Sequence, residues 1–157
     1  MLYKLILILN LFTMEKILVS VDFSDLATVA IDYAASLAKA FKSQIRILHV
    51  VAQVPSYVGN EIMPPVFPTE NKEEIERMSQ ELTAMAEYLI KLGIEAHYEL
   101  AHGPVIETIL ENAGSYNAEL IILGAHNHGF LYRAFMGSVC TGVVKHSHIP
   151  VLIIPGR

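Results

Sequence analysis

Short, mostly apolar runs alternate along the chain with longer segments in which apolar residues recur every three or four positions. Four of these runs are nearly continuous, which is typical of strands buried on both faces of a parallel sheet. The third run alternates between apolar and polar residues, as a more exposed strand does. The five predicted strands are 17–21, 45–51, 94–100, 120–123 and 149–154.

The segments between the strands predict helices. Ser24 and Asp25 supply capping residues before an apolar spacing of three and four that runs from Leu26 to Phe41. The other predicted helices are 75–92, 105–113 and 137–145. This βαβαβαβαβ pattern, with right-handed crossovers, predicts an α/β fold: a doubly wound, Rossmann-like, five-stranded parallel sheet of order 3-2-1-4-5 with helices on both faces.

Two segments lie outside this pattern. Residues 1–13 form an apolar run with one lysine, which has no small-residue cleavage site after it and is shorter than the roughly 20 residues that span a bilayer. We therefore expect a leader or a mis-assigned start before Met14, with a membrane anchor as the alternative, and a single domain over 14–157. Residues 52–69 carry four prolines and predict a long functional or mobile loop.

Composition narrows the class of protein. The chain has 157 residues, of which 53% are hydrophobic and 17% charged, and this suits one domain with a substantial core. The net charge of −5, with no basic stripe, argues against a nucleic acid as partner. The single cysteine, Cys140, excludes an internal disulfide and fits a reducing compartment, so we expect a cytoplasmic protein.

The candidate chemistry begins with Gly124-Ala-His-Asn-His-Gly129, which is followed by Gly137-Ser138. The glycine-bearing stretch follows a predicted strand, and Gly137-Ser138 opens a predicted helix, an arrangement in which backbone amides hold an anion. In strand order 3-2-1-4-5 the ligand crevice lies between the first and fourth strands. Asp22, which follows the first strand, and Gly124, which follows the fourth, are therefore expected to meet there.

From residue 14 to residue 155 the chain resembles the universal stress proteins of the UspA type. The resemblance is carried by segment 16–24, by His49-Val50, by the 124–139 loop and by segment 148–154. Nucleotide-binding members carry Gly-x2-Gly-x9-Gly-(Ser/Thr) after the fourth strand. Here Asn127 replaces the second glycine, and asparagine is one of the few residues that tolerate left-handed backbone angles.

The resemblance implies an adenine-nucleotide site for ATP or AMP, with Mg²⁺ as an optional companion of the phosphates. Asp22 would contact the base or ribose and Val50 would flank the adenine. The glycine loop and the helix start would surround the phosphates. The implied residues are Ser20, Asp22, Phe23, Val50, Gly124, His126, Asn127, Gly129, Gly137, Ser138, Val139 and Cys140.

Several of these residues have structural alternatives. Asp22 would cap the first helix whether or not a ligand binds, and Ser138 would be an ordinary first-turn helix residue. Cys140 stands where the family often has Ser or Thr, and a thiol is the weaker donor. It also lacks a visible base, so no catalytic residue is assigned.

Two histidine pairs have a spacing that allows chelation. These are His126-x-His128 and His146-x-His148, but no cysteine or paired carboxylate beside them completes a tetrahedral metal site. We therefore expect no protein-bound metal. A histidine that is charged at low pH beside a bound phosphate is the alternative role for the first pair.

The sequence thus predicts an adenine-nucleotide-binding regulatory protein of the stress response. Strand 149–154 would form an apolar sheet edge, and pairing of this edge predicts a homodimer. One alternative is a slow, metal-dependent ATPase. The other is a nucleotide-free dimeric interaction module, in which Asn127 would mark a disabled loop.

Overall fold

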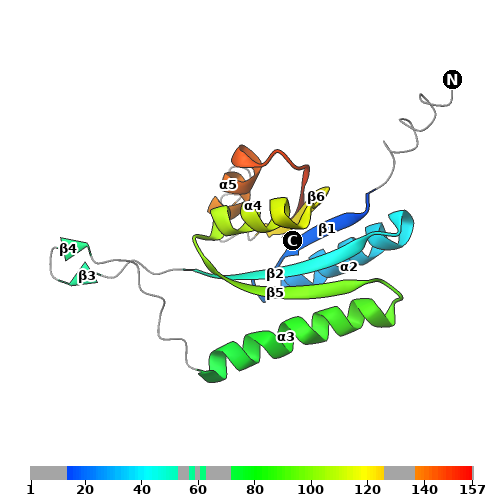
Figure 1. The fold of residues 1–157 in the computed structure, drawn as a ribbon, viewed down its shortest axis with the longest axis horizontal. Coiled ribbons are helices and arrows are strands. Elements are labelled where there is room, and N and C mark those ends of the chain that lie inside the picture. Colours follow the sequence, from blue (N-terminus) through cyan, green and yellow to red (C-terminus); the bar gives the residue numbers. More distant parts are fainter. Residues whose placement is uncertain (1–13, 53–56, 59–60, 63–71, 126–136, 157) are drawn as a thin grey trace.

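The computed structural model describes residues 14–52, 57–58, 61–62, 72–125 and 137–156. Its main sheet has five parallel strands in the order β5-β2-β1-β6-β7 (Figure 1). These strands are β1 (Lys16–Ser20), β2 (Gln44–Ala52), β5 (Ala96–Gly103), β6 (Leu120–Ala125) and β7 (Val151–Pro155). Counted along the chain within this sheet, the order is 3-2-1-4-5, which confirms the predicted topology.

Helices cover both faces of the sheet (Figure 1). The helices α2 (Asp25–Phe41) and α3 (Lys72–Lys91) enclose one apolar core, and α4 (Val105–Tyr116) and α5 (Ser138–His146) enclose the other. In β1, Ile17 and Val19 face the first core while Leu18 faces the second, and all three are fully buried. A strand with a core on each side is apolar at successive positions along its buried part, which explains the nearly continuous runs in the sequence.

Several strand ends differ from the sequence prediction. β6 continues through Gly124 to Ala125, and Gly124 is paired with Ile154 of β7 rather than opening a loop. β5 continues to Gly103, which pairs with Ala52 at the end of β2. In each case the strand is longer because its neighbour still offers partners for backbone hydrogen bonds at that level of the sheet.

β7 begins at Val151, two residues later than the predicted start of strand 149–154. The Ser147 hydroxyl donates a hydrogen bond to the Ile149 carbonyl and accepts one from the Ile149 amide, at 2.7 and 3.0 Å. Pro150 has no N–H to donate. The local turn and the proline therefore delay the strand.

The region 52–69 was predicted to be irregular, but part of it is regular. Strands β3 (Tyr57–Val58) and β4 (Glu61–Ile62) pair in antiparallel fashion as a separate two-stranded sheet. Most of the other residues of this loop lie outside the described part of the chain. Within the described ranges, no helix combines the length and the apolarity needed to cross a bilayer.

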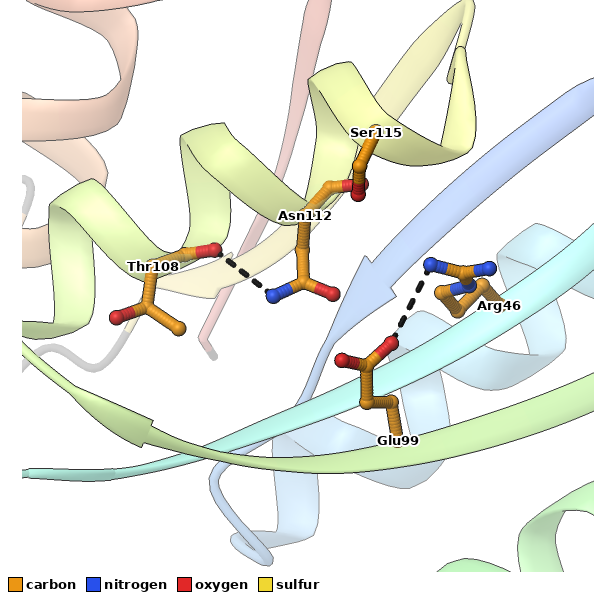
Figure 2. A network of polar contacts seen from close by, with 5 residues as sticks. All are labelled: Arg46, Glu99, Thr108, Asn112 and Ser115. Atoms are coloured by element: carbon orange, nitrogen blue, oxygen red, sulfur yellow. Dashed lines mark hydrogen bonds and ion pairs between the residues drawn. The ribbon is translucent and has the colours of Figure 1, made fainter.

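Figure 2 shows polar contacts within α4 and between β2 and β5. Arg46 of β2 and Glu99 of β5 form an ion pair of 3.3 Å, and the Arg46 guanidinium lies 4.2 Å from the centre of the Tyr116 ring at the end of α4. Asn112 donates to the Thr108 carbonyl within the helix at 3.1 Å. Because the Arg46 and Glu99 side chains are 27% and 43% exposed, the pair contributes about 1 kcal/mol or less.

Candidate functional site

A cavity of about 240 Å³ lies at the carboxyl ends of the strands, where β1 and β6 lead to opposite sides of the sheet. This is the topological switch point, at which doubly wound sheets bind their ligands. The predicted site residues that line it are Ser20, Asp22, Val50, Gly124, Val139 and Cys140. The structure therefore brings together residues from both ends of the sequence, as the strand order predicted.

A larger hollow, of about 470 Å³, lies elsewhere, between α2 and α3. Its lining combines apolar side chains such as Ile31 and Met85 with the carboxylates Asp32 and Glu81. Carboxylates repel a phosphate, and this hollow does not lie at the strand ends. The smaller cavity at the switch point is therefore the better candidate for an anionic ligand.

The start of α5 supplies the positive end of the cavity. Gly137 is the N-cap residue, and it has no side chain with which to cap the helix amides. The amide of Thr141 makes the first bond of the helix, to the Gly137 carbonyl at 3.0 Å. The amides of Ser138, Val139 and Cys140 therefore have no partner within the helix, and an anion at this point would accept hydrogen bonds from them and interact favourably with the helix dipole.

Asp22 supplies a negative charge to the same cavity. Its Oδ1 atom accepts hydrogen bonds from the Ser24 amide at 3.2 Å and from the Ser24 hydroxyl at 2.5 Å. These bonds stabilise the turn before α2, whose first amides receive no side-chain cap. The cavity thus combines a carboxylate after β1 with amide donors at the start of α5. It therefore offers hydrogen-bond partners both to an anionic group and to the hydroxyl or amino donors of a ligand.

Cys140 forms part of the cavity wall. Its side chain is buried, and Sγ donates to the Gly124 carbonyl at 3.4 Å. Burial, and next the negative charge of Asp22, raise the pKa of the thiol above its ordinary value. A raised pKa keeps the thiol neutral and a poor nucleophile at neutral pH, so its contribution is packing and one weak hydrogen bond.

The raised pKa predicts slow thiol chemistry. Because the folded protein disfavours the thiolate, Cys140 should react with a disulfide reagent more slowly than free cysteine at pH 8, and the difference should disappear on unfolding in guanidinium. The same shift means that the unfolded chain ionises first, so this group lowers stability as the pH rises above about 8.5. Cys140 is the sole cysteine of the chain, so the released chromophore reports on it alone. A native rate equal to that of free cysteine would contradict the prediction.

The two described glycines of the loop motif serve different purposes. A Cβ atom on Gly124 would lie 3.3 Å from Cβ of Leu26 in α2, closer than most such contacts. A Cβ on Gly137 would meet no heavy atom of the described residues within 4 Å. Gly124 therefore permits the close packing of α2 against β6, whereas no contact within the described protein requires a glycine at position 137.

Of the remaining predicted residues, Gly137 and Ser138 open α5 but are not among the residues that line the cavity. His126, Asn127 and Gly129 lie outside the described residues. Phe23 lies next to the cavity, where its ring stacks on His49 with the centroids 4.2 Å apart, and its backbone is left-handed with φ of 59°. Such a conformation costs a non-glycine residue roughly 1–2 kcal/mol and indicates a tightly held turn.

Some cavity residues were not assigned from the sequence, namely Val21, His49, Val105 and Leu123. His49 had a visible signal, because it is a polar residue in the mostly apolar strand 45–51 and stands directly before Val50. Among the described residues, no group of three or more His, Cys, Asp or Glu side chains could hold a metal ion. Nδ1 of His146 instead bonds the Gly142 carbonyl at 2.9 Å within α5.

Comparisons with known proteins agree on one family. The sequence model described as the universal stress protein family matches residues 13–155. A universal stress protein of Methanocaldococcus jannaschii is 30% identical over 146 residues, covering 89% of this chain and 81% of that protein. The universal stress protein YxiE of Bacillus subtilis is 31% identical over 145 residues, covering 89% of this chain and 98% of that protein.

Solved structures share the fold. The universal stress protein UspA from Lactobacillus plantarum superposes with a TM-score of 0.73 at 22% identity, covering 90% of this chain and 98% of that one. A universal stress protein from Archaeoglobus fulgidus in complex with dAMP gives a TM-score of 0.64 at 22% identity, covering 88% and 96% of the two chains. A further universal stress protein, in complex with cAMP, gives a TM-score of 0.66 at 19% identity, covering 91% of this chain and 98% of that one.

Proposed function

Because this chain belongs to the universal stress protein family, we propose that it is a regulatory protein that binds an adenine nucleotide, ATP or AMP, in the crevice between β1 and β6. The observation that carries the proposal is a single cavity lined by Asp22 after β1 and by Val139 and Cys140 from the first turn of α5. The complexes of two structurally similar proteins with dAMP and cAMP support it. Mg²⁺, if it is required, would arrive with the phosphates.

The charges determine how the nucleotide would lie. Its phosphates would accept hydrogen bonds from the amides at the start of α5, and the Asp22 carboxylate would repel them from its own side chain. The ribose hydroxyls or the adenine amino group would donate to Asp22, and Val50 would contact the base. With about 240 Å³, the cavity is at the small end of ligand pockets, which suits one mononucleotide rather than a dinucleotide.

We further propose that the protein acts as a cytoplasmic homodimer formed by one domain over 14–157. β7 has a strand neighbour on one side only, which is β6, and its Leu152 and Ile153 are half-buried rather than covered. An apolar edge of this kind is covered or paired in stable proteins. The sole cysteine and the family support the cytoplasmic location.

The nucleotide proposal is tested directly by analysing the purified protein. We expect adenine nucleotide in the supernatant of denatured protein by mass spectrometry, and calorimetric binding of ATP or AMP after its removal. Asn127→Gly should bind as well as or better than wild type, because glycine relieves backbone strain and leaves room for a phosphate. If neither protein binds ATP or AMP, the nucleotide proposal is wrong. Steady phosphate release that stops in Asp22→Ala would instead indicate a slow ATPase.

A further inference from the structure

The turn after β1 is held by contacts from the neighbouring strand. The Val21 amide donates to the Leu48 carbonyl at 2.9 Å, and Nδ1 of His49 lies 2.8 Å from the Val21 carbonyl oxygen. The Phe23 ring packs on the His49 ring, with the centroids 4.2 Å apart and the planes inclined by 37°. Asp22 therefore lies between Val21 and Phe23, and His49 contacts both of these neighbours.

The hydrogen bond to Val21 determines which ring nitrogen of His49 carries the hydrogen. A carbonyl oxygen only accepts hydrogen bonds, so Nδ1 is the ring nitrogen that donates to Val21. The ring contact also supports Phe23 in its left-handed conformation, which an aromatic residue rarely adopts on its own.

We propose that His49 is a positioning residue of the nucleotide site, which fixes the backbone on both sides of Asp22 and so places the Asp22 carboxylate in the cavity. This inference rests on the proposed nucleotide function. It gives a role in binding to His49, which had been noted only as part of the family resemblance. A carboxylate held in place before the ligand arrives loses less conformational entropy on binding. His49 thus strengthens binding through Asp22, although its own ring also lines the cavity.

Two substitutions separate the hydrogen bond from His49 to Val21 from the ring contact with Phe23. His49→Phe keeps a ring against Phe23 but removes the donor to Val21. His49→Asn loses the ring but places an amide N–H close to the position of Nδ1. We expect His49→Phe to weaken AMP binding about tenfold, the effect of losing roughly one hydrogen bond, and His49→Asn to stay within about threefold of wild type.

A double-mutant cycle with Asp22→Ala distinguishes positioning from direct contact or simple packing. If His49 acts through Asp22, His49→Phe should change AMP affinity by less than about twofold when Asp22 is already alanine. Losses that multiply in the double mutant, or wild-type affinity in His49→Phe, would overturn the inference while leaving the nucleotide function intact. Absence of AMP and ATP binding by the wild type would overturn both.

A measurement on the unaltered protein guards against variants that do not fold. The nitrogen chemical shifts of the neutral His49 ring should show the hydrogen on Nδ1. A ring protonated on Nε2 instead would be incompatible with the bond to Val21 and would overturn the inference. In His49→Phe, amide exchange at Phe23 and Ser24 should accelerate while exchange in the centre of β2 stays unchanged. Equal acceleration in both places would mean that His49 only stabilises the fold.

Discussion

Replacing Gly137 with valine is expected to weaken nucleotide binding strongly and to leave the protein folded. The backbone of Gly137, with φ of −50° and ψ of 158°, suits any L-residue, and an added Cβ would contact no described heavy atom within 4 Å. The new side chain would instead occupy the space beside the α5 amides that a phosphate must approach. Losing charge-assisted hydrogen bonds worth roughly 2–3 kcal/mol should raise the Kd for AMP at least about 30-fold in calorimetry.

Gly124→Val provides the matched control, because it adds the same atoms to the other described glycine of the motif. Its Cβ would lie 3.3 Å from Cβ of Leu26, and the γ-methyl groups would push α2 away from β6. We expect a loss of about 1–3 kcal/mol of stability and a Tm lower by roughly 3–10 °C. Gly137→Val should melt like wild type. Normal AMP binding by Gly137→Val, or an equal fall of Tm in both variants, would contradict this division of roles.

The topology of the main sheet could be predicted from the sequence because each strand has a core on both faces. A segment such as 17–21 can be apolar throughout only where helices cover both sides, and the crossover rule then restricts the order of the strands. The position of the cavity follows from that order, which is why Asp22 and Gly124 could be assigned to one crevice. Strand ends were less predictable, because β6 and β7 support each other's last residues through pairing.

The roles of single residues were harder to predict, because they depend on partners that are distant in sequence. Gly124 was expected to give a loop its freedom, yet its lack of a side chain is required by Leu26 of α2. His49 was visible as a polar residue in an apolar strand, but its function depends on the turn after β1, which pairing brings beside it. Spacing along one segment contains no information about such contacts.

The assembly of the protein can be tested by substitution in β7, the edge strand at the opposite end of the main sheet from β5. Ile153→Glu is expected to convert the proposed homodimer into a monomer, because it places a charge in the middle of β7, the apolar edge. Burying an unpaired carboxylate between two edges costs several kcal/mol, enough to shift the Kd of a dimer by more than about a hundredfold. Light scattering after size exclusion at micromolar concentration should show one chain mass for the variant and two for wild type.

Tyr98→Glu on β5 is the control for this experiment, since it places the same charge on the other edge strand of the sheet. Tyr98 is 41% exposed, and its neighbours His97 and Glu99 already make that edge polar, which disfavours pairing with another chain. Tyr98→Glu should therefore remain a dimer. Since β7 and the α5 amides are separate features, Ile153→Glu should still bind AMP if it stays soluble. A monomeric wild type, or a dimer that Tyr98→Glu dissociates and Ile153→Glu does not, would show that β7 is not the interface.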